Sequence, residues 1–253
     1  MNILCIGNSF AVDSATYVHQ LAEKSGQNIF ICVLYIGGCP ILRHWNNYKS
    51  GDKEYEFYIN GSRTPEMWCS IHEGLAYRKW DYITFQQVSY NSGDSSTFFP
   101  ELTYLMDEIR KVSQARYLLH KTWSYAKTHS HEKYGSNPMD QNAMTLDIEN
   151  AYEEVSEKSG IKGIIPVGTA ITEARKLFGD ELNRDGFHLN ELGRTLASLV
   201  WAYYFLGEKA NFDGFAPSGY SYDDITPGIS DKEFEIVNKI AREVVTSNSK
   251  HNL

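Results

Sequence analysis

The chain has 253 residues, of which 42% are hydrophobic and 22% charged, so it can bury a full core as one globular domain. Its net charge of −8, with no cluster of Lys or Arg, argues against nucleic acid as a partner, because phosphate contacts need concentrated positive charge. No apolar run approaches the roughly twenty residues of a membrane helix, so we expect no membrane partner and a cytoplasmic protein, or a periplasmic or secreted one if a signal peptide has been removed.

Apolar runs with β-branched residues alternate with amphipathic stretches along the chain. We predict strands at Asn2–Ile6, Ile29–Tyr35, Tyr82–Phe85, Ala115–His120 and Gly163–Val167. We predict helices at Val12–Ser25, Phe98–Ser113, Met139–Ser159, Thr169–Phe178 and Glu191–Leu206. This alternation is typical of βαβ units. The expected fold class is therefore α/β, a three-layer α/β/α flavodoxin-like fold with a central parallel sheet of about five strands.

Other segments interrupt or extend this alternation. Residues 55–68 read as a hairpin around Asn60-Gly61 or as an irregular excursion. Tyr125–Pro138 reads as a surface loop long enough to border a site. Nothing resembles a domain linker, so we expect one domain over residues 1–253. A C-terminal coil and helix, at about 211–245, should pack on that domain, with the helix at Asp231–Val245.

Residues suited to nucleophilic catalysis lie near both ends of the chain. Asp185 and His188 are three residues apart, just before a predicted helix, so the carboxylate can orient the imidazole. Ser9 follows the first predicted strand, and ligands of such sheets bind beyond the carboxyl ends of the strands. The structural alternatives are a helix cap at Asn8 or Ser9 and a helix start at Asp185. If the two ends meet, they form a Ser-His-Asp triad.

These motifs resemble those of the SGNH (GDSL-like) hydrolase superfamily. Gly7-Asn8-Ser9-Phe10 is similar to its first block, and Asp185-Gly186-Phe187-His188 to its DxxH last block. The resemblance spans about residues 2–207 and is nearest to an uncharacterised bacterial branch with a Gly-Asn-Ser-Phe first block. Asn8 stands where the superfamily usually has Asp. The resemblance implies Ser9 as nucleophile, His188 as base and Asp185 as its orienting acid.

The resemblance also implies an oxyanion hole with three donors. Two are the backbone amides of Ser9 and of Gly38, with Gly37 as the alternative to Gly38. The third block usually reads Gly-x-Asn-Asp, whereas this chain has Gln86-Gln87-Val88-Ser89 after the third predicted strand. We expect Gln87 to donate from its side chain, because a glutamine offers the same N–H₂ group as an asparagine. Gln86 and Asn91 are the alternatives. Further residues that we expect to contact substrate are Asn8, His44 and Trp123.

The predicted function is a serine esterase that removes small acyl groups, in particular acetyl, from carbohydrate through an acyl-enzyme. A short-chain lipid esterase, a thioesterase and a catalytically silent carbohydrate-binding protein on the same fold are the alternatives. The mechanism needs no cofactor. The four cysteines, Cys5, Cys32, Cys39 and Cys69, show no CxxC spacing, so we expect no metal site. The sequence does not predict an oligomeric state.

Overall fold

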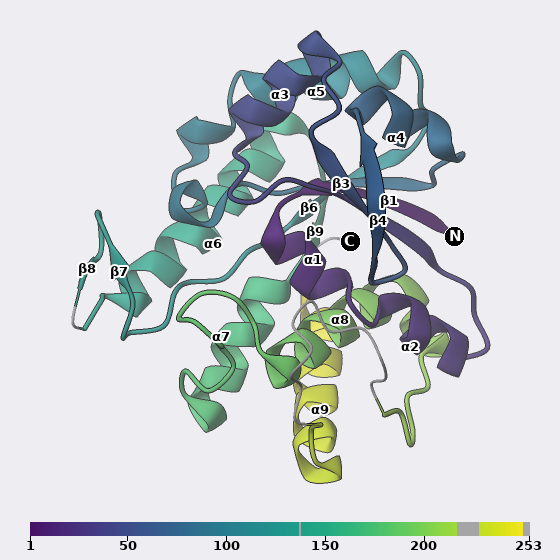
Figure 1. Ribbon diagram of the computed structural model, residues 1–253. Helices are drawn as coiled ribbons and strands as arrows, with labels where there is room; N and C mark the ends of the chain where they lie inside the picture. Colours follow the sequence, from purple (N-terminus) through teal and green to yellow (C-terminus); the bar gives the residue numbers. More distant parts are fainter. Residues whose placement is uncertain (137, 217–227, 250–253) are drawn as a thin grey trace.

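The computed structural model describes residues 1–136, 138–216 and 228–249 (Figure 1). Within these residues one seven-stranded sheet has the strand order β4-β3-β2-β1-β5-β6-β9. Its parallel strands are β1 (Asn2–Gly7), β2 (Phe30–Tyr35), β5 (Tyr82–Phe85), β6 (Arg116–His120) and β9 (Gly163–Ile165). Helices cover both faces, which confirms the three-layer α/β/α prediction. The five predicted parallel strands are the core of this sheet.

The predicted hairpin extends the sheet at one edge. β3 (Tyr55–Ile59) pairs antiparallel with β2, and β4 (Ser62–Cys69) pairs antiparallel with β3. Asn60 and Gly61 connect them with φ values of 52° and 86°. Two left-handed residues form the hairpin turn that Asn-Gly favours, so the local sequence explains the connection. The sheet therefore has seven strands where the sequence predicted about five.

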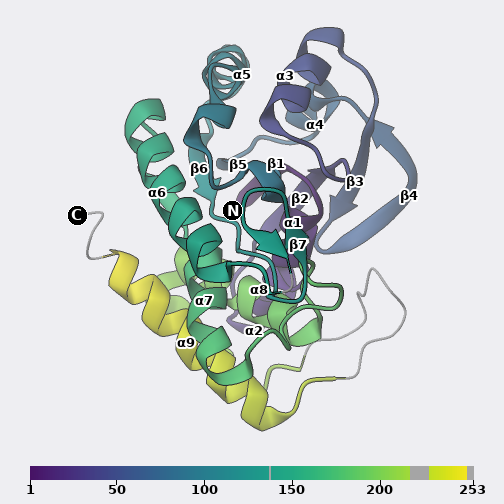
Figure 2. The same ribbon diagram turned by 90° about the vertical axis from the view of Figure 1, so that its left-hand side faces the viewer.

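Figures 1 and 2 show the helices gathered on the two sides of the sheet. One side holds α1 (Ser9–Ala15), α2 (Val18–Lys24), α7 (Val167–Phe178), α8 (Glu191–Leu206) and α9 (Asp231–Ser249). The other side holds α3 (Ile41–Ser50), α4 (Ile71–Tyr77) and α5 (Glu101–Arg110). The long helix α6 (Gln141–Ser159) contacts β9 and α7. Short elements are η1 (Ser89–Asn91), η2 (Ser95–Phe98), β7 (Ser130–His131), β8 (Gly135–Ser136) and η3 (Gly207–Lys209).

Helix α8 is buried on almost every side. The sheet-side helices α1, α2 and α7 pack against it, and α9 covers its outer surface. A helix covered in this way is apolar around most of its circumference, as α8 is. The predicted packing of the C-terminal helix on the domain thus corresponds to the contact of α9 with α8. Of the predicted coil before it, residues 217–227 lie outside the described residues.

Two features of the helices differ from the prediction. The single helix expected over Val12–Ser25 is divided into α1 and α2, because the Thr16 hydroxyl donates to the carbonyls of Val12 and Asp13 at the end of the first helix. Helices α3 and α4 were not predicted. None of the described helices combines the length and apolar character that crossing a membrane requires.

Candidate active site

The loops that follow β1, β2, β5 and β6 meet at one edge of the sheet, because the carboxyl ends of parallel strands lie together. The chain leaves β1 toward β2 on one side and later enters β5 on the other side of β1. Such a reversal in strand order opens a crevice beside the central strand. Ser9 stands directly after β1, at this reversal. Its position predicts a ligand site at the same place.

Ser9, His188 and Asp185 form a hydrogen-bonded row. The Oγ atom of Ser9 lies 2.9 Å from Nε2 of His188, and Nδ1 of His188 lies 2.6 Å from Oδ2 of Asp185. Partial burial raises the pKa of the Asp185 carboxyl, but hydrogen bonds from the His188 ring and from backbone N–H groups outweigh it, so this pKa lies below its ordinary value. An ionised Asp185 accepts a hydrogen bond from the protonated Nδ1 of His188. This leaves Nε2 unprotonated, so it can accept the hydrogen bond of the Ser9 hydroxyl.

The segment from Arg184 to Leu189 is a tight loop that holds the acid and the base together. Asp185 Oδ1 accepts from the His188 backbone N–H at 2.8 Å, and the Arg184 N–H donates to the His188 carbonyl at 2.9 Å. Gly186 has a φ of +94°, which favours glycine, and a Cβ there would lie 3.1 Å from the His129 ring. The DxxH spacing therefore folds back on itself through local hydrogen bonds and one glycine.

Asp13 anchors this loop to the helix that carries Ser9. Its carboxylate is buried and accepts from the Leu189 N–H at 2.9 Å, from Arg194 Nε at 2.9 Å and from Arg184 at 3.1 Å. Arg184 and Leu189 directly flank the acid and base, so Asp13 holds both ends of the loop. Asp13 was not predicted from the sequence as a site residue. The available signal was its position four residues after Ser9, which places both on one side of a helix.

The Gly37-Gly38 turn after β2 lies beside the nucleophile. Gly38 has a φ of +59°, a conformation that glycine adopts without strain. The Asn8 side chain caps α1 by accepting from the Phe10 N–H at 3.1 Å, and its Nδ2 donates to the Cys39 carbonyl at 3.3 Å. Asn8 is buried by these contacts. It therefore connects the serine turn to the glycine turn, whereas the sequence had suggested that it contacts substrate.

The structure contradicts the prediction of Gln87 as the third oxyanion donor. Its Nε2 donates to the Thr97 carbonyl at 2.7 Å and to the Thr97 hydroxyl at 3.1 Å. Its Oε1 accepts from the backbone N–H groups of Ile41 and Val88. The Nε2 group is thus engaged with Thr97 in η2, while the side-chain oxygen holds the start of α3. Strand alternation turns the neighbouring Gln86 toward Asn8 instead.

Two further residues expected at the substrate surface are buried. His44 is fully buried in α3, with Nδ1 at 2.9 Å from the Tyr55 hydroxyl. Trp123 is also buried, stacks on Phe10 with ring centroids 4.0 Å apart, and donates from its ring nitrogen to the Phe187 carbonyl at 2.8 Å. Trp123 therefore supports the loop that carries Asp185 through its hydrogen bond to the Phe187 carbonyl. The error in both cases arises from burial by tertiary packing, which the local sequence does not reveal.

Comparison with known proteins assigns the chain to a family. Residues 2–224 match the family described as a domain of unknown function, DUF4886. The chain is a DUF4886 protein. A crystal structure of a DUF4886 family protein from Bacteroides uniformis is 31% identical and has a TM-score of 0.86, with 97% of this chain and 95% of that chain covered. No curated protein sequence matches the chain.

More distant solved structures share the fold of this DUF4886 protein. A proposed SGNH hydrolase from Slackia heliotrinireducens is 23% identical, with a TM-score of 0.55 over 80% of this chain and 97% of that chain. The acetylxylan esterase Axe2 of Geobacillus stearothermophilus is 14% identical, with a TM-score of 0.53 over 85% of this chain and 94% of that chain. At these identities the likeness establishes an SGNH-like fold.

A cavity of about 60 Å³ opens beside the serine of the DUF4886 chain. Its lining residues are Ser9, Val12, Asp13, Tyr35, Arg184 and His188. This volume is under half of the roughly 150 Å³ that accommodates benzene in a protein interior. Of these residues, Ser9 and His188 were predicted from the sequence and the other four were not. The cavity has room for a group of only a few heavy atoms next to the nucleophile.

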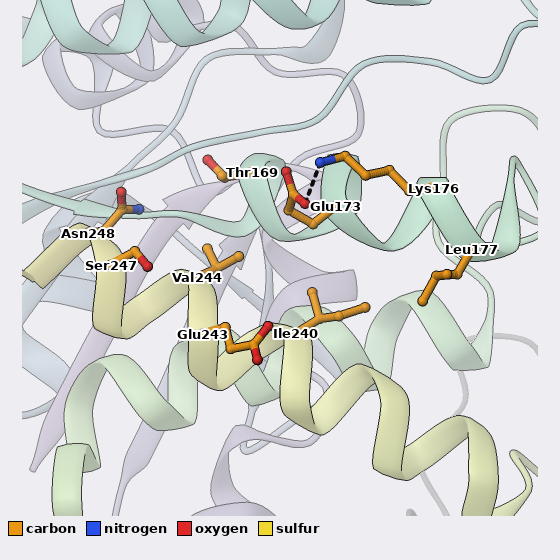
Figure 3. Close-up of a pocket in the computed structure, with 9 residues that line it drawn as sticks. All are labelled: Thr169, Glu173, Lys176, Leu177, Ile240, Glu243, Val244, Ser247 and Asn248. Carbon is orange, nitrogen blue, oxygen red and sulfur yellow. Dashed lines mark hydrogen bonds and ion pairs between the residues drawn. The ribbon is translucent and has the colours of Figure 1, made fainter.

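A wider hollow lies between α7 and α9, away from Ser9 (Figure 3). Its volume is about 470 Å³, and its lining includes the ion pair of Glu173 and Lys176 at 2.6 Å. The hydroxyl groups on its wall belong to Thr169 and Ser247, and no histidine lines it. A serine or threonine nucleophile needs a neighbouring base. Of these two hollows, the smaller cavity at Ser9 is therefore the better candidate for catalysis.

Proposed function

We propose that this DUF4886 protein is a serine esterase that hydrolyses small acyl esters. The observation that carries the proposal is the hydrogen-bonded row of Ser9, His188 and Asp185, in which each partner has the role that nucleophilic catalysis needs. The nucleophile and its base come from opposite ends of the chain. A structural role for either residue alone gives no reason for their hydroxyl and imidazole to meet at 2.9 Å.

The proposed reaction has two steps. In the first, Ser9 Oγ attacks the ester carbonyl, its proton passes to His188 Nε2, and His188 returns that proton to the departing alcohol. In the second, water attacks the acyl-enzyme as His188 takes its proton, and His188 then returns that proton to Ser9 Oγ as the acid departs. Asp185 orients the ring and stabilises its charged form. The backbone N–H groups of Ser9 and Gly38 hold the oxyanion in both steps.

The small cavity suggests which part of the substrate is limited in size. It is lined by Ser9 and, one turn further along α1, by Val12 and Asp13. The side chain of Tyr35 closes it on the side of β2. We place the acyl group here, since the acyl carbon is bonded to Ser9 Oγ in the intermediate. A cavity of about 60 Å³ suits an acetyl group and excludes a long acyl chain.

We further propose a carbohydrate as the alcohol. Axe2, which shares the fold, is an acetylxylan esterase. The partly exposed rings of Phe187 and His129 have centroids 5.1 Å apart at the loop from Arg184 to Leu189, where they can pack against the apolar face of a sugar. A short-chain lipid ester or a thioester would use the same triad. A carbohydrate-binding protein without activity would not need the Ser9–His188 hydrogen bond.

The decisive experiment compares wild type with Ser9→Ala. Wild type should hydrolyse p-nitrophenyl acetate and form an adduct at Ser9 with a fluorophosphonate probe, whereas Ser9→Ala should do neither. Equal hydrolysis by the two proteins would refute the mechanism, and a folded wild type without an adduct would favour the binding protein. Acetate release from acetylated xylan, pectin, sialic acid and peptidoglycan fragments then identifies the alcohol.

A further inference from the structure

A row of buried side chains leads from the interior to the turn that carries the nucleophile. Ser14 Oγ lies 3.0 Å from His120 Nε2, His120 Nδ1 lies 2.6 Å from Gln86 Oε1, and Gln86 Nε2 lies 2.6 Å from Asn8 Oδ1. All four residues are at most 2% exposed. They come from α1, the end of β6 and the end of β5. We call these four residues the buried polar row.

The direction of every hydrogen bond in the buried polar row follows from one backbone group. The Phe10 N–H can only donate, so the Asn8 atom that faces it at 3.1 Å is the carbonyl oxygen. That oxygen also receives the amide of Gln86, so the oxygen of Gln86 faces His120. His120 must then donate from Nδ1 and accept the Ser14 proton at Nε2. Burial lowers the pKa of His120 to about 3, in agreement with a neutral ring.

At its Asn8 end, the buried polar row connects the two candidate oxyanion donors. Asn8 precedes Ser9, and its Nδ2 donates to the carbonyl of Cys39, the residue after Gly38. An aspartate at position 8 has no N–H to give that carbonyl and would bring a buried negative charge against it. An asparagine at position 8 can therefore hold the glycine turn in place through its hydrogen bond to the Cys39 carbonyl. Gln86 complements it, because its amide donates to the remaining lone pair of the Asn8 oxygen.

We propose that Gln86 and His120 are positioning residues of the oxyanion hole, acting through Asn8 on the backbone N–H groups of Ser9 and Gly38. The inference rests on the proposed esterase function. It gives a shared role to Asn8 in the first block and Gln86 in the third block, where this chain differs from the SGNH pattern. Because the Gln87 side chain is engaged with Thr97, more of the oxyanion stabilisation falls to the two backbone donors, whose mutual placement is sensitive to small displacements.

The test is a double-mutant cycle of Gln86→Met and Asn8→Ala, with Gln87→Met as the matched control. Methionine keeps the length of glutamine without its hydrogen bonds. Gln86→Met should lower kcat for p-nitrophenyl acetate roughly 10- to 100-fold with KM changed less than about threefold, and should slow phosphonylation of Ser9 in parallel. Gln87→Met should lower kcat less than about threefold. The double variant should be no slower than Asn8→Ala alone, because both changes act through one group.

Several results would overturn the inference. One is an unchanged kcat in Gln86→Met. Another is a kcat in the double variant that equals the product of the separate effects of Gln86→Met and Asn8→Ala. A third is a loss of kcat in Gln87→Met as large as that in Gln86→Met. If Gln86→Met does not fold, Ser14→Ala breaks the buried polar row at its far end and should lower kcat about two- to fivefold at constant KM. An unchanged kcat in that variant also overturns it. Failure of the esterase proposal is separate, because it appears in wild type as the absence of a Ser9 adduct.

Discussion

Two fully buried histidines should make the protein less stable in mild acid. Burial lowers the pKa of both His44 and His120 from 6.5 to about 3, and the charge of Arg43 adds to this effect at His44. Below about pH 6.5 the unfolded chain binds a proton at each histidine that the folded chain does not bind. The stability that these neutral rings contribute is therefore complete above that pH and is lost as the pH falls toward 3.

The size of this effect follows from the pKa difference. Each pH unit within the window costs about 1.36 kcal/mol per histidine, so moving to about pH 5 removes roughly 2 kcal/mol for each ring. His44→Gln removes one titrating ring and keeps a polar group near the Tyr55 hydroxyl. The variant costs stability at every pH, so the informative quantity is the difference in pH dependence between variant and wild type. The contributions of carboxylates cancel in that difference.

The assay is urea unfolding followed by tryptophan fluorescence at about pH 7.5 and about pH 5. Wild type should lose about 2 kcal/mol more than His44→Gln between the two conditions, a midpoint difference on the order of 1 M urea. A double variant with His120→Gln should remove about 4 kcal/mol of pH dependence. If the stability of wild type and His44→Gln depends on pH in the same way, His44 is not held neutral in the folded protein and the prediction is refuted.

Three further predictions concern the catalytic loop and the cavity. Asp185→Asn should lower kcat about ten-thousandfold at similar KM, because the His188 ring loses its orienting acceptor, and steady-state kinetics with less than a tenfold loss would contradict that role. Asp13→Asn should lower the free energy of unfolding by about 3 to 5 kcal/mol and reduce kcat, because it leaves the guanidinium groups of Arg184 and the buried Arg194 without a negative partner. A urea midpoint equal to that of wild type would argue against Asp13 as the anchor of this loop. Tyr35→Ala should raise kcat/KM for p-nitrophenyl butyrate relative to the acetate roughly tenfold, and an unchanged ratio places the acyl group elsewhere.

The sequence was sufficient for the layers of the fold because strand and helix periodicities are local properties. The runs that became β1, β2, β5, β6 and β9 are short, apolar and separated by helical patterns, and the parallel sheet follows from them. The break between α1 and α2 depends on the side-chain hydrogen bonds of Thr16 and on the packing of Tyr17. Helix propensity alone does not contain that information, so one long helix was predicted.

The part of the site that depends on the spacing of residues along the chain was predictable from the sequence. The DxxH loop folds through its own hydrogen bonds, and the spacing of Asp185 and His188 was enough to predict that their side chains meet. The direction of a buried side chain is decided by neighbours distant in sequence, which is why Gln87, His44 and Trp123 were misplaced. All three residue types are chemically suited to bind substrate. Only the surrounding packing distinguishes a residue that supports the site from one that faces it.

The precision of the site depends on how α8 packs against α1. The Ser198 hydroxyl donates to the Ser14 carbonyl at 3.0 Å and accepts from the Tyr17 N–H at 3.1 Å, while Glu191 accepts the Tyr17 hydroxyl. These contacts join residues more than 170 positions apart in the chain. They fix the start of α8 relative to α1, and the catalytic loop enters α8 directly. The distance between Ser9 and His188 is therefore determined by a helix interface, with Asp13 as its charged centre.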